Sequence, residues 1–244
     1  MKHPPSSSKR TPSVESSPSG PSRAPDPRPF HVASRAHRDH RPGHAARDRP
    51  RIPPPRAPQQ RDALAARSKG AATAPVTVYE MADFQCPACR GFTMNVMPAI
   101  EQQFIQRGKV RWVFINLPLV SIHPNAMAAA EVAMCASRQG RFWETHDALY
   151  LLQDDWAGLP QPRVKLIALA ERAGVDRKKL IACIDSGTAR TEVQQDAQRA
   201  MLSGAHATPS FYIEGGLMQG APPTPDPMVK VLDSIYAVRS RANQ

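Results

Sequence analysis

Apolar residues from position 74 onward follow two spacings, one typical of buried strands and one typical of amphipathic helices. The run Val76–Met81 is β-branched and aromatic, and Lys109–Asn116 alternates before it becomes continuously apolar, so both segments are predicted core strands. Pro98 lies inside the helix predicted between them, from Pro87 to about Gln106, and predicts a kink. The apolar residues of this helix recur every four positions: Phe92, Val96, Ile100 and Phe104.

The second half of the chain changes from helical to sheet-like periodicity. Residues 123 to about 204 show helical periods separated by glycine breaks, which predicts four or five helices and no strand. Ser210–Ile213 and Leu217–Gly220 flank a Glu-Gly-Gly turn and predict a hairpin, followed by a helix from about Asp226 to Arg239. The element order is that of an α/β protein with a thioredoxin fold and a helical insertion at about residues 120–204.

Composition separates residues 1–73, the N-terminal arm, from a domain at residues 74–244. The arm holds 14 of the 26 prolines, 15 of the 32 Lys and Arg residues, 5 of the 21 acids and one aromatic residue, Phe30. Such a segment cannot bury enough apolar surface to offset chain entropy, so we expect a disordered arm. The formal charge of +11 comes almost entirely from this arm and therefore says nothing about the partner of the domain.

The charge of the arm allows contact with nucleic acid or an anionic surface, and tethering by the arm stays an alternative function. No aromatic residues are interleaved to stack on bases, so we expect no specific nucleic-acid binding. The arm shows no apolar core of a secretory signal, and no run approaches the ~20 apolar residues of a membrane span. An extracytoplasmic protein with a misplaced start or a degenerate signal, and a cytoplasmic protein, both fit this pattern.

Cys86 and Cys89 lie where the first strand gives way to the first helix, with Pro87 and Ala88 between them. A helix N-terminus stabilises a thiolate on the first sulfur, while the second sulfur can resolve a mixed disulfide. Cys86 is therefore the predicted nucleophile and Cys89 the predicted resolving thiol. Half of a zinc site has the same spacing, but the remaining candidates form no second metal-binding pair, and we expect no metal: Cys135, Cys183, His123, His146 and His206.

Three separated segments resemble the DsbA family of bacterial disulfide oxidoreductases, whose thioredoxin fold carries a helical insertion. Ala207–Tyr212 looks like the cis-proline loop of that family, and Gly140–Leu149 is similar to a recurring segment of its insertion. The resemblance covers about residues 74–240. It is carried most strongly by the active-site segment Glu80-Met81-Ala82-Asp83-Phe84-Gln85-Cys86-Pro87-Ala88-Cys89.

The resemblance implies further site residues. It implies a cis bond before Pro209, which would place Thr208 beside the sulfurs and offer its backbone to a peptide; an ordinary trans bond is the alternative. It implies that Glu80 is a buried acid that relays a proton to the resolving thiol, against the alternative of a solvated strand residue. No cofactor is implied, because the thiols themselves are the redox centre.

Cys135 and Cys183 fall on different predicted helices of the insertion. Some relatives carry a second disulfide, and a bond here would favour an oxidising compartment. Otherwise the two residues are small buried hydrophobes. For His123 and His146 we favour a capping or packing role over catalysis.

We predict a thiol–disulfide oxidoreductase that acts on cysteine-containing protein substrates, as an oxidant, in the periplasm or another extracytoplasmic space. The family implies a redox partner protein in the membrane that reoxidises the cysteine pair. Ala88 departs from the family pattern, since better-known oxidising members have His or an aromatic residue there. The alternatives are a reductase or isomerase of the same fold, and a peptide-binding or chaperone module whose cysteines form a structural disulfide.

Overall fold

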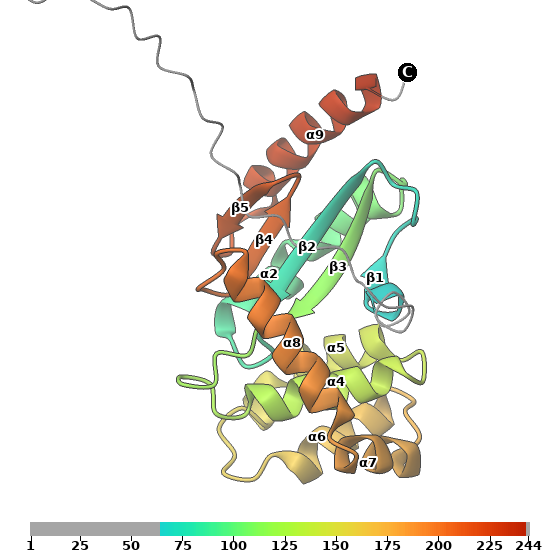
Figure 1. Ribbon diagram of the computed structural model, residues 1–244, viewed down its shortest axis with the longest axis vertical. Helices are drawn as coiled ribbons and strands as arrows, with labels where there is room; N and C mark the ends of the chain where they lie inside the picture. Colours follow the sequence, from blue (N-terminus) through green and yellow to red (C-terminus); the bar gives the residue numbers. More distant parts are fainter. Residues whose placement is uncertain (1–63, 243–244) are drawn as a thin grey trace, which may run out of the picture. The chain divides into compact units, whose positions relative to one another are not determined.

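The computed structural model describes residues 64–242, which form a mixed five-stranded sheet and a helical subdomain (Figure 1). The strand order is β1-β3-β2-β4-β5, with β2 parallel to β3 and every other neighbouring pair antiparallel. The strands are β1 Ser68–Lys69, β2 Val76–Ala82, β3 Val110–Asn116, β4 Ser210–Ile213 and β5 Gly216–Gln219. The predicted core strands and the hairpin are therefore confirmed, and the fold class is α/β.

One face of the sheet packs against the helices that follow β2 and β5. These helices are α2 Pro87–Asn95, α3 Met97–Ile100, a π-helical turn at Glu101–Ile105, and α9 Pro225–Ala242. Phe92 and Phe104 pack there with Val78 and Trp112, which are paired in the register of β2 and β3. All four apolar residues of the predicted first helix are buried, as its period indicates.

The predicted kink is present. α2 ends at Asn95, and the chain re-enters a helix at Met97 with Pro98 in its first turn. Proline has no N–H to donate, and its ring clashes with the carbonyl of the residue four positions earlier. It is tolerated in a first helical turn, where that N–H would have no partner within the helix.

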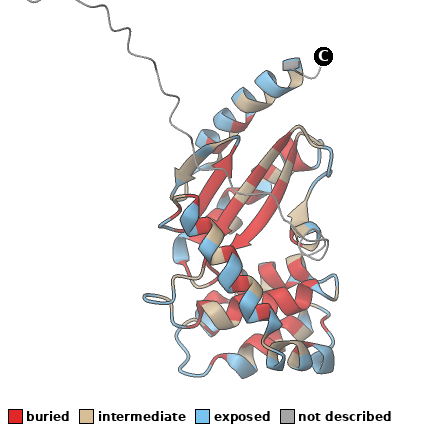
Figure 2. Cartoon of the chain, viewed as in Figure 1, coloured by how far each residue is buried: buried red, intermediate tan, exposed pale blue. Residues whose placement is uncertain are grey.

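The insertion between β3 and β4 is entirely helical, as predicted. It contains α4 Ala126–Ser137, α5 Phe142–Leu151, a 3-10 turn at Gln153–Asp155, α6 Arg163–Arg172, α7 Arg177–Asp185 and α8 Thr188–Leu202. α4 is buried along most of its length and packs against the four other α-helices (Figure 2). A helix that is apolar on all sides belongs in a core, and α4 is the centre of this subdomain.

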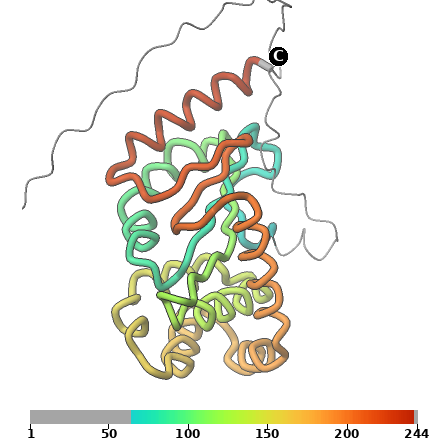
Figure 3. Tube along the Cα trace, turned by 60° about the vertical axis from the view of Figure 1, so that its left-hand side comes forward, coloured from blue at the N-terminus to red at the C-terminus, as the bar shows by residue number. Residues whose placement is uncertain are grey.

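α8 connects the insertion to the sheet. Figures 1 and 3 show it running from the lower helices up to the strands. Ala200, near its C-terminal end, packs with Met81 and Val113 on the sheet face opposite α2. Both faces of the central strands are thereby covered, which explains their nearly continuous apolar sequences.

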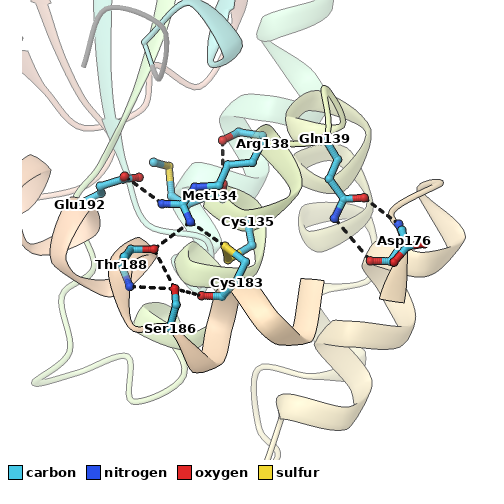
Figure 4. Close-up of a disulfide and its surroundings, with 10 residues drawn as sticks. Met134, Cys135, Arg138, Gln139, Asp176, Cys183, Ser186, Thr188 and Glu192 are labelled. Atoms are coloured by element: carbon cyan, nitrogen blue, oxygen red, sulfur yellow. Dashed lines mark hydrogen bonds and ion pairs between the residues drawn. A yellow bond between two sulfur atoms is a disulfide. The ribbon is translucent and has the colours of Figure 1, made fainter. Parts of the chain in front are cut away.

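Cys135 of α4 and Cys183 of α7 form a disulfide, with sulfurs 2.07 Å apart (Figure 4). Of the two alternatives left open for these cysteines, a second disulfide and two buried free thiols, the structure shows the disulfide. The bond closes a sequence separation of 48 residues, a loop for which the chain-entropy model gives about 4 kcal/mol of stabilisation. It fixes the outer helix α7 to the central helix α4.

The predicted boundary of the arm at residue 73 is too far along the chain. Residues 1–63 lie outside the described residues, and disorder there stays a prediction. Ser68 and Lys69 form the edge strand β1, which pairs with β3, and Arg67 is buried in an ion pair with Asp196 of α8. The composition of residues 1–73 gives no sign that these residues are ordered. Two strand residues and one buried arginine are too few to form a periodic pattern.

The Arg67–Asp196 pair leads to a stability prediction. Asp196 also accepts from the Asn116 side chain at 2.8 Å, and both charged side chains are nearly inaccessible. Arg67→Met leaves a buried carboxylate without its cation, so we expect the free energy of unfolding in urea to fall by about 3–5 kcal/mol. Arg90→Met is the control, because Arg90 pairs with the exposed Asp154 and should cost less than about 1 kcal/mol. Equal losses in both variants would contradict the burial argument.

Candidate active site

The cysteine pair lies at the N-terminus of α2, as the sequence predicts. Cys86 is the residue before the helix, in an extended conformation, and Pro87 occupies the first turn. Both cysteines are free thiols in this structure; 6% of Cys86 is exposed, whereas Cys89 is completely buried. An incoming thiol can therefore reach Cys86 but not Cys89.

A loop far along the chain completes the surroundings of Cys86. The Thr208–Pro209 peptide bond is cis, as the resemblance implies. In its thiol form, Cys86 donates from Sγ to the carbonyl oxygen of Thr208 at 3.4 Å, although 122 positions separate the two residues. The Pro209 carbonyl accepts from the Gly220 N–H at 2.8 Å, which ties the loop to the end of β5. The fold thus brings Thr208, the residue before the cis bond, to the Cys86 thiol.

The two thiols have opposite acidities. A hydrogen bond from the Cys89 side chain, helped by contacts with Thr208 and the backbone of Cys89 and Ala88, lowers the pKa of Cys86 to about 6 against the opposing effect of burial. Burial, followed by the interaction with Cys86, raises the pKa of Cys89 well above its ordinary value. Cys86 is therefore mostly a thiolate at neutral pH, and Cys89 stays protonated.

Glu80 is completely buried on β2, so its placement excludes the alternative of a solvated strand residue. One carboxyl oxygen accepts from the indole N–H of Trp112 at 2.7 Å, and the other has no hydrogen-bond partner among the described residues. Burial raises the pKa of Glu80 to about 7, although the bond from Trp112 opposes this shift. A charged Glu80 in turn raises the pKa of Cys89, so the two groups are electrostatically coupled.

The insertion holds the active-site segment through residues that sequence reasoning missed. Gln153 donates from its side chain to the carbonyl oxygens of Phe84 at 2.7 Å and Cys86 at 3.2 Å. The Tyr150 hydroxyl donates to the carbonyl of Asp83 at 3.2 Å. These bonds supply hydrogen-bond donors to backbone carbonyl oxygens between β2 and α2, which are buried away from water. A Gln and a Tyr about 70 positions away carry no signal of this contact in the sequence.

The two histidines of the insertion differ in their surroundings. His146 is buried and lies edge-on to the rings of Phe84, Phe114 and Tyr150, in agreement with the packing role we favoured. Burial lowers its pKa. His123 instead contacts the buried carboxylate of Asp83.

No cluster of three or more His, Cys, Asp or Glu side chains that could hold a metal ion is found within residues 64–242. Within the same part of the chain, every helix is too short or too polar to span a bilayer.

Comparison with known proteins places this geometry in a family. The family model described as Thioredoxin matches residues 63–234. The "Probable disulfide bond formation protein D" of Bacillus anthracis is 30% identical over 171 residues, which cover 68% of this chain and 76% of that protein. The chain belongs to the thioredoxin family, in its DsbA-like group.

Two further matches show how this DsbA-like chain relates to other proteins. The crystal structure of Wolbachia pipientis alpha-DsbA1 is similar in fold, with a TM-score of 0.65 and 21% identity over 73% of this chain and 94% of that one. The "Na(+)/H(+) antiporter NhaA 3" of Salinispora tropica is 37% identical over 147 residues, 60% of this chain. The matched segment is only 21% of that antiporter, so the chain spans about a fifth of the length of this relative.

The acidity of Cys86 gives a direct prediction. We expect the rate of alkylation of the reduced protein by iodoacetamide to rise with pH around a midpoint of about 6, because only the thiolate reacts. The masses of proteolytic peptides should assign the first added group to Cys86, since Cys89 is buried. Cys86→Ser should abolish the alkylation that has this midpoint. A midpoint near the ordinary thiol value of 9.0 would contradict the stabilisation described above.

Proposed function

We propose that this protein is a thiol–disulfide oxidoreductase that oxidises cysteine pairs in protein substrates. The observation that carries the proposal is the contrast between a reachable Cys86 of low pKa and a buried Cys89 of high pKa, with Thr208 beside Cys86. Nucleophile and resolving thiol are thereby distinguished by their surroundings. The disulfide bond formation protein of B. anthracis supports the same class of activity.

The reaction begins with the Cys86–Cys89 disulfide. A substrate thiolate attacks Sγ of Cys86, the disulfide breaks, and Cys89 leaves with the electron pair and takes up a proton. A second substrate thiolate then attacks the substrate sulfur of the mixed disulfide, and Cys86 leaves as a thiolate. Two electrons have passed from the substrate to the cysteine pair, and the substrate holds a new disulfide.

Glu80 is suited to supply the proton that Cys89 takes up. Its pKa of about 7 means that the carboxyl can both hold and release a proton at neutral pH. Thr208 is suited to bind the backbone of the substrate, since it lies beside Cys86, two residues before β4 begins. Pro209 fixes the path of the loop at this point.

The direction of electron flow follows from thiolate stability. A stabilised Cys86 thiolate favours the reduced pair, which makes the disulfide form an oxidant. Nucleophilic cysteines of this fold have pKa values from about 3.5 in DsbA to about 7 in thioredoxin, and Cys86 lies between them. Ala88 supplies no side-chain charge beside the sulfur. We therefore propose an oxidant weaker than DsbA, with a reductase or isomerase as the alternative.

The second disulfide supports an oxidising compartment. Disulfides such as Cys135–Cys183 persist in extracytoplasmic spaces and are rare in the cytosol. We therefore place the protein in the periplasm or another extracytoplasmic space. An oxidant must be reoxidised after each turnover, and we propose a redox partner protein in the membrane for this step.

The decisive measurement is the reduction potential of the Cys86–Cys89 pair in glutathione buffers of set ratio, with alkylated thiols counted by mass. We expect a potential between about −120 mV, as in DsbA, and about −200 mV. A value near about −270 mV, as in thioredoxin, would establish the reductase alternative instead.

The cysteine variants test the catalytic roles. When reduced Cys89→Ser is mixed with a protein that contains a disulfide, the Cys86 thiolate should attack that disulfide, release one substrate thiol and remain in a mixed disulfide on non-reducing gels, because Cys89 is absent and cannot displace the substrate. Cys86→Ser should form none and should lose activity by at least about 100-fold. Full activity of Cys86→Ser would favour the chaperone alternative.

Glu80→Gln tests the proton relay. The amide cannot exchange a proton, so we expect the thiol exchange rate at pH 7 to fall on the order of 10- to 100-fold. In the native protein the raised pKa of Glu80 means that stability falls as pH rises from about 4.5 through about 7. The variant should lose this part of the pH dependence of urea unfolding. Unchanged rates in the variant would remove Glu80 from the mechanism.

A further inference from the structure

Asp83 is a buried carboxylate placed between the end of β2 and Cys86, and its side chain is completely inaccessible to solvent. Its Oδ1 accepts from the Gln85 N–H at 2.7 Å. Its Oδ2 accepts from the Leu119 N–H at 2.8 Å and from Nδ1 of His123 at 2.8 Å. A buried carboxylate requires such donors, because burial of an unpaired charge is strongly unfavourable.

The same residue builds the turn that presents the nucleophile. The carbonyl oxygen of Asp83 accepts from the Cys86 N–H at 3.1 Å, while its side chain bonds to the backbone two residues on, at Gln85. An Asp that bonds to the backbone two residues later stabilises a tight turn. The orientation of the Asp83 side chain therefore fixes the place where Cys86 enters α2.

His123 reaches this turn from the connection between β3 and α4. Only 16% of its side chain is exposed, and two of the three donors to Asp83 are backbone groups, so His123 is the donor that a substitution can remove. A second bond joins the same two segments, from the Asn125 N–H to the side-chain oxygen of Gln85 at 2.7 Å. The connection thus holds the active-site turn on both sides of Phe84.

We propose that His123 is a positioning residue for Cys86 that acts through Asp83; this inference rests on the proposed function and adds a residue to it. With the donor present, the turn holds Cys86 so that the backbone of Ala88 and Cys89 can stabilise its thiolate. Without it, one bond to Oδ2 is lost and the turn loosens. The thiolate is then less stabilised, and the pair becomes less oxidising.

The test compares His123→Ala with His123→Asn in the full chain. The side-chain amide of Asn has a donor at the same number of bonds from the backbone as Nδ1, so it can preserve the bond to Asp83. Ile122→Ala is the matched control, because Ile122 is the neighbouring residue and is 66% exposed. For each variant, the pKa of Cys86 is read from the pH dependence of alkylation, and the equilibrium with glutathione is measured separately.

We expect His123→Ala to raise the pKa of Cys86 by about 0.5–1 unit and to shift the glutathione equilibrium roughly three- to tenfold toward the protein disulfide. His123→Asn should retain most of the wild-type behaviour, and Ile122→Ala should retain all of it. Should the alanine variant not fold, His123→Leu, which keeps the side-chain volume but lacks the donor, takes its place with the same expected result.

An unchanged pKa of Cys86 and an unchanged equilibrium in His123→Ala would overturn the proposal, even if the melting temperature fell. Equal shifts in the alanine and asparagine variants would also overturn it, because the effect would then not depend on the donor. Equal shifts in Ile122→Ala would assign the effect to the loop as a whole and have the same consequence. A wild-type pair that does not exchange with glutathione would instead count against the proposed function.

Discussion

Stabilisation of negative charge on one nearly buried sulfur is the constraint on which the rest of the site depends. Cys86 has little contact with water, so the protein itself must supply the groups that lower its pKa. The backbone at the helix N-terminus, the Cys89 thiol and the Thr208 side chain act on this sulfur from different parts of the fold. The β2–α2 turn and the hairpin β4–β5 must therefore be held in register with each other, which the antiparallel pairing of β2 with β4 achieves.

Polar groups buried near this sulfur are arranged in two different ways. Asp83 has a donor for each carboxylate oxygen and serves to hold backbone in place. Glu80 has one oxygen bonded to Trp112 and one without a partner among the described residues, and its pKa is raised. A fully bonded carboxylate is suited to fixing a turn, whereas an under-bonded one is suited to exchanging a proton. The two acids lie three positions apart in sequence, and we propose different roles for them because their surroundings differ.

The helical insertion does more than enlarge the protein. Its connection to β3 contacts the active-site turn through His123 and Asn125, and its 3-10 turn contacts the carbonyls of Phe84 and Cys86 through Gln153. Two further interactions connect helices within the insertion (Figure 4): the disulfide between α4 and α7, and the salt bridge from Arg138 to Glu192 of α8. A rigid insertion can hold the turn in one geometry, which a catalytic thiol requires.

The sequence alone determined the order of the elements, the buried faces of the strands and first helix, and the place of Cys86 at a helix start. Each of these follows from local periodicity or from residues adjacent in the chain. Only the tertiary structure decided that Cys135 bonds to Cys183, that β1 joins the sheet, and that Thr208 lies at the nucleophile. The contact of His123 with Asp83 and the raised pKa of Glu80 belong to the same group. These features depend on contacts between distant segments and on the loss of water around charged groups, and neither has a periodicity that a sequence displays.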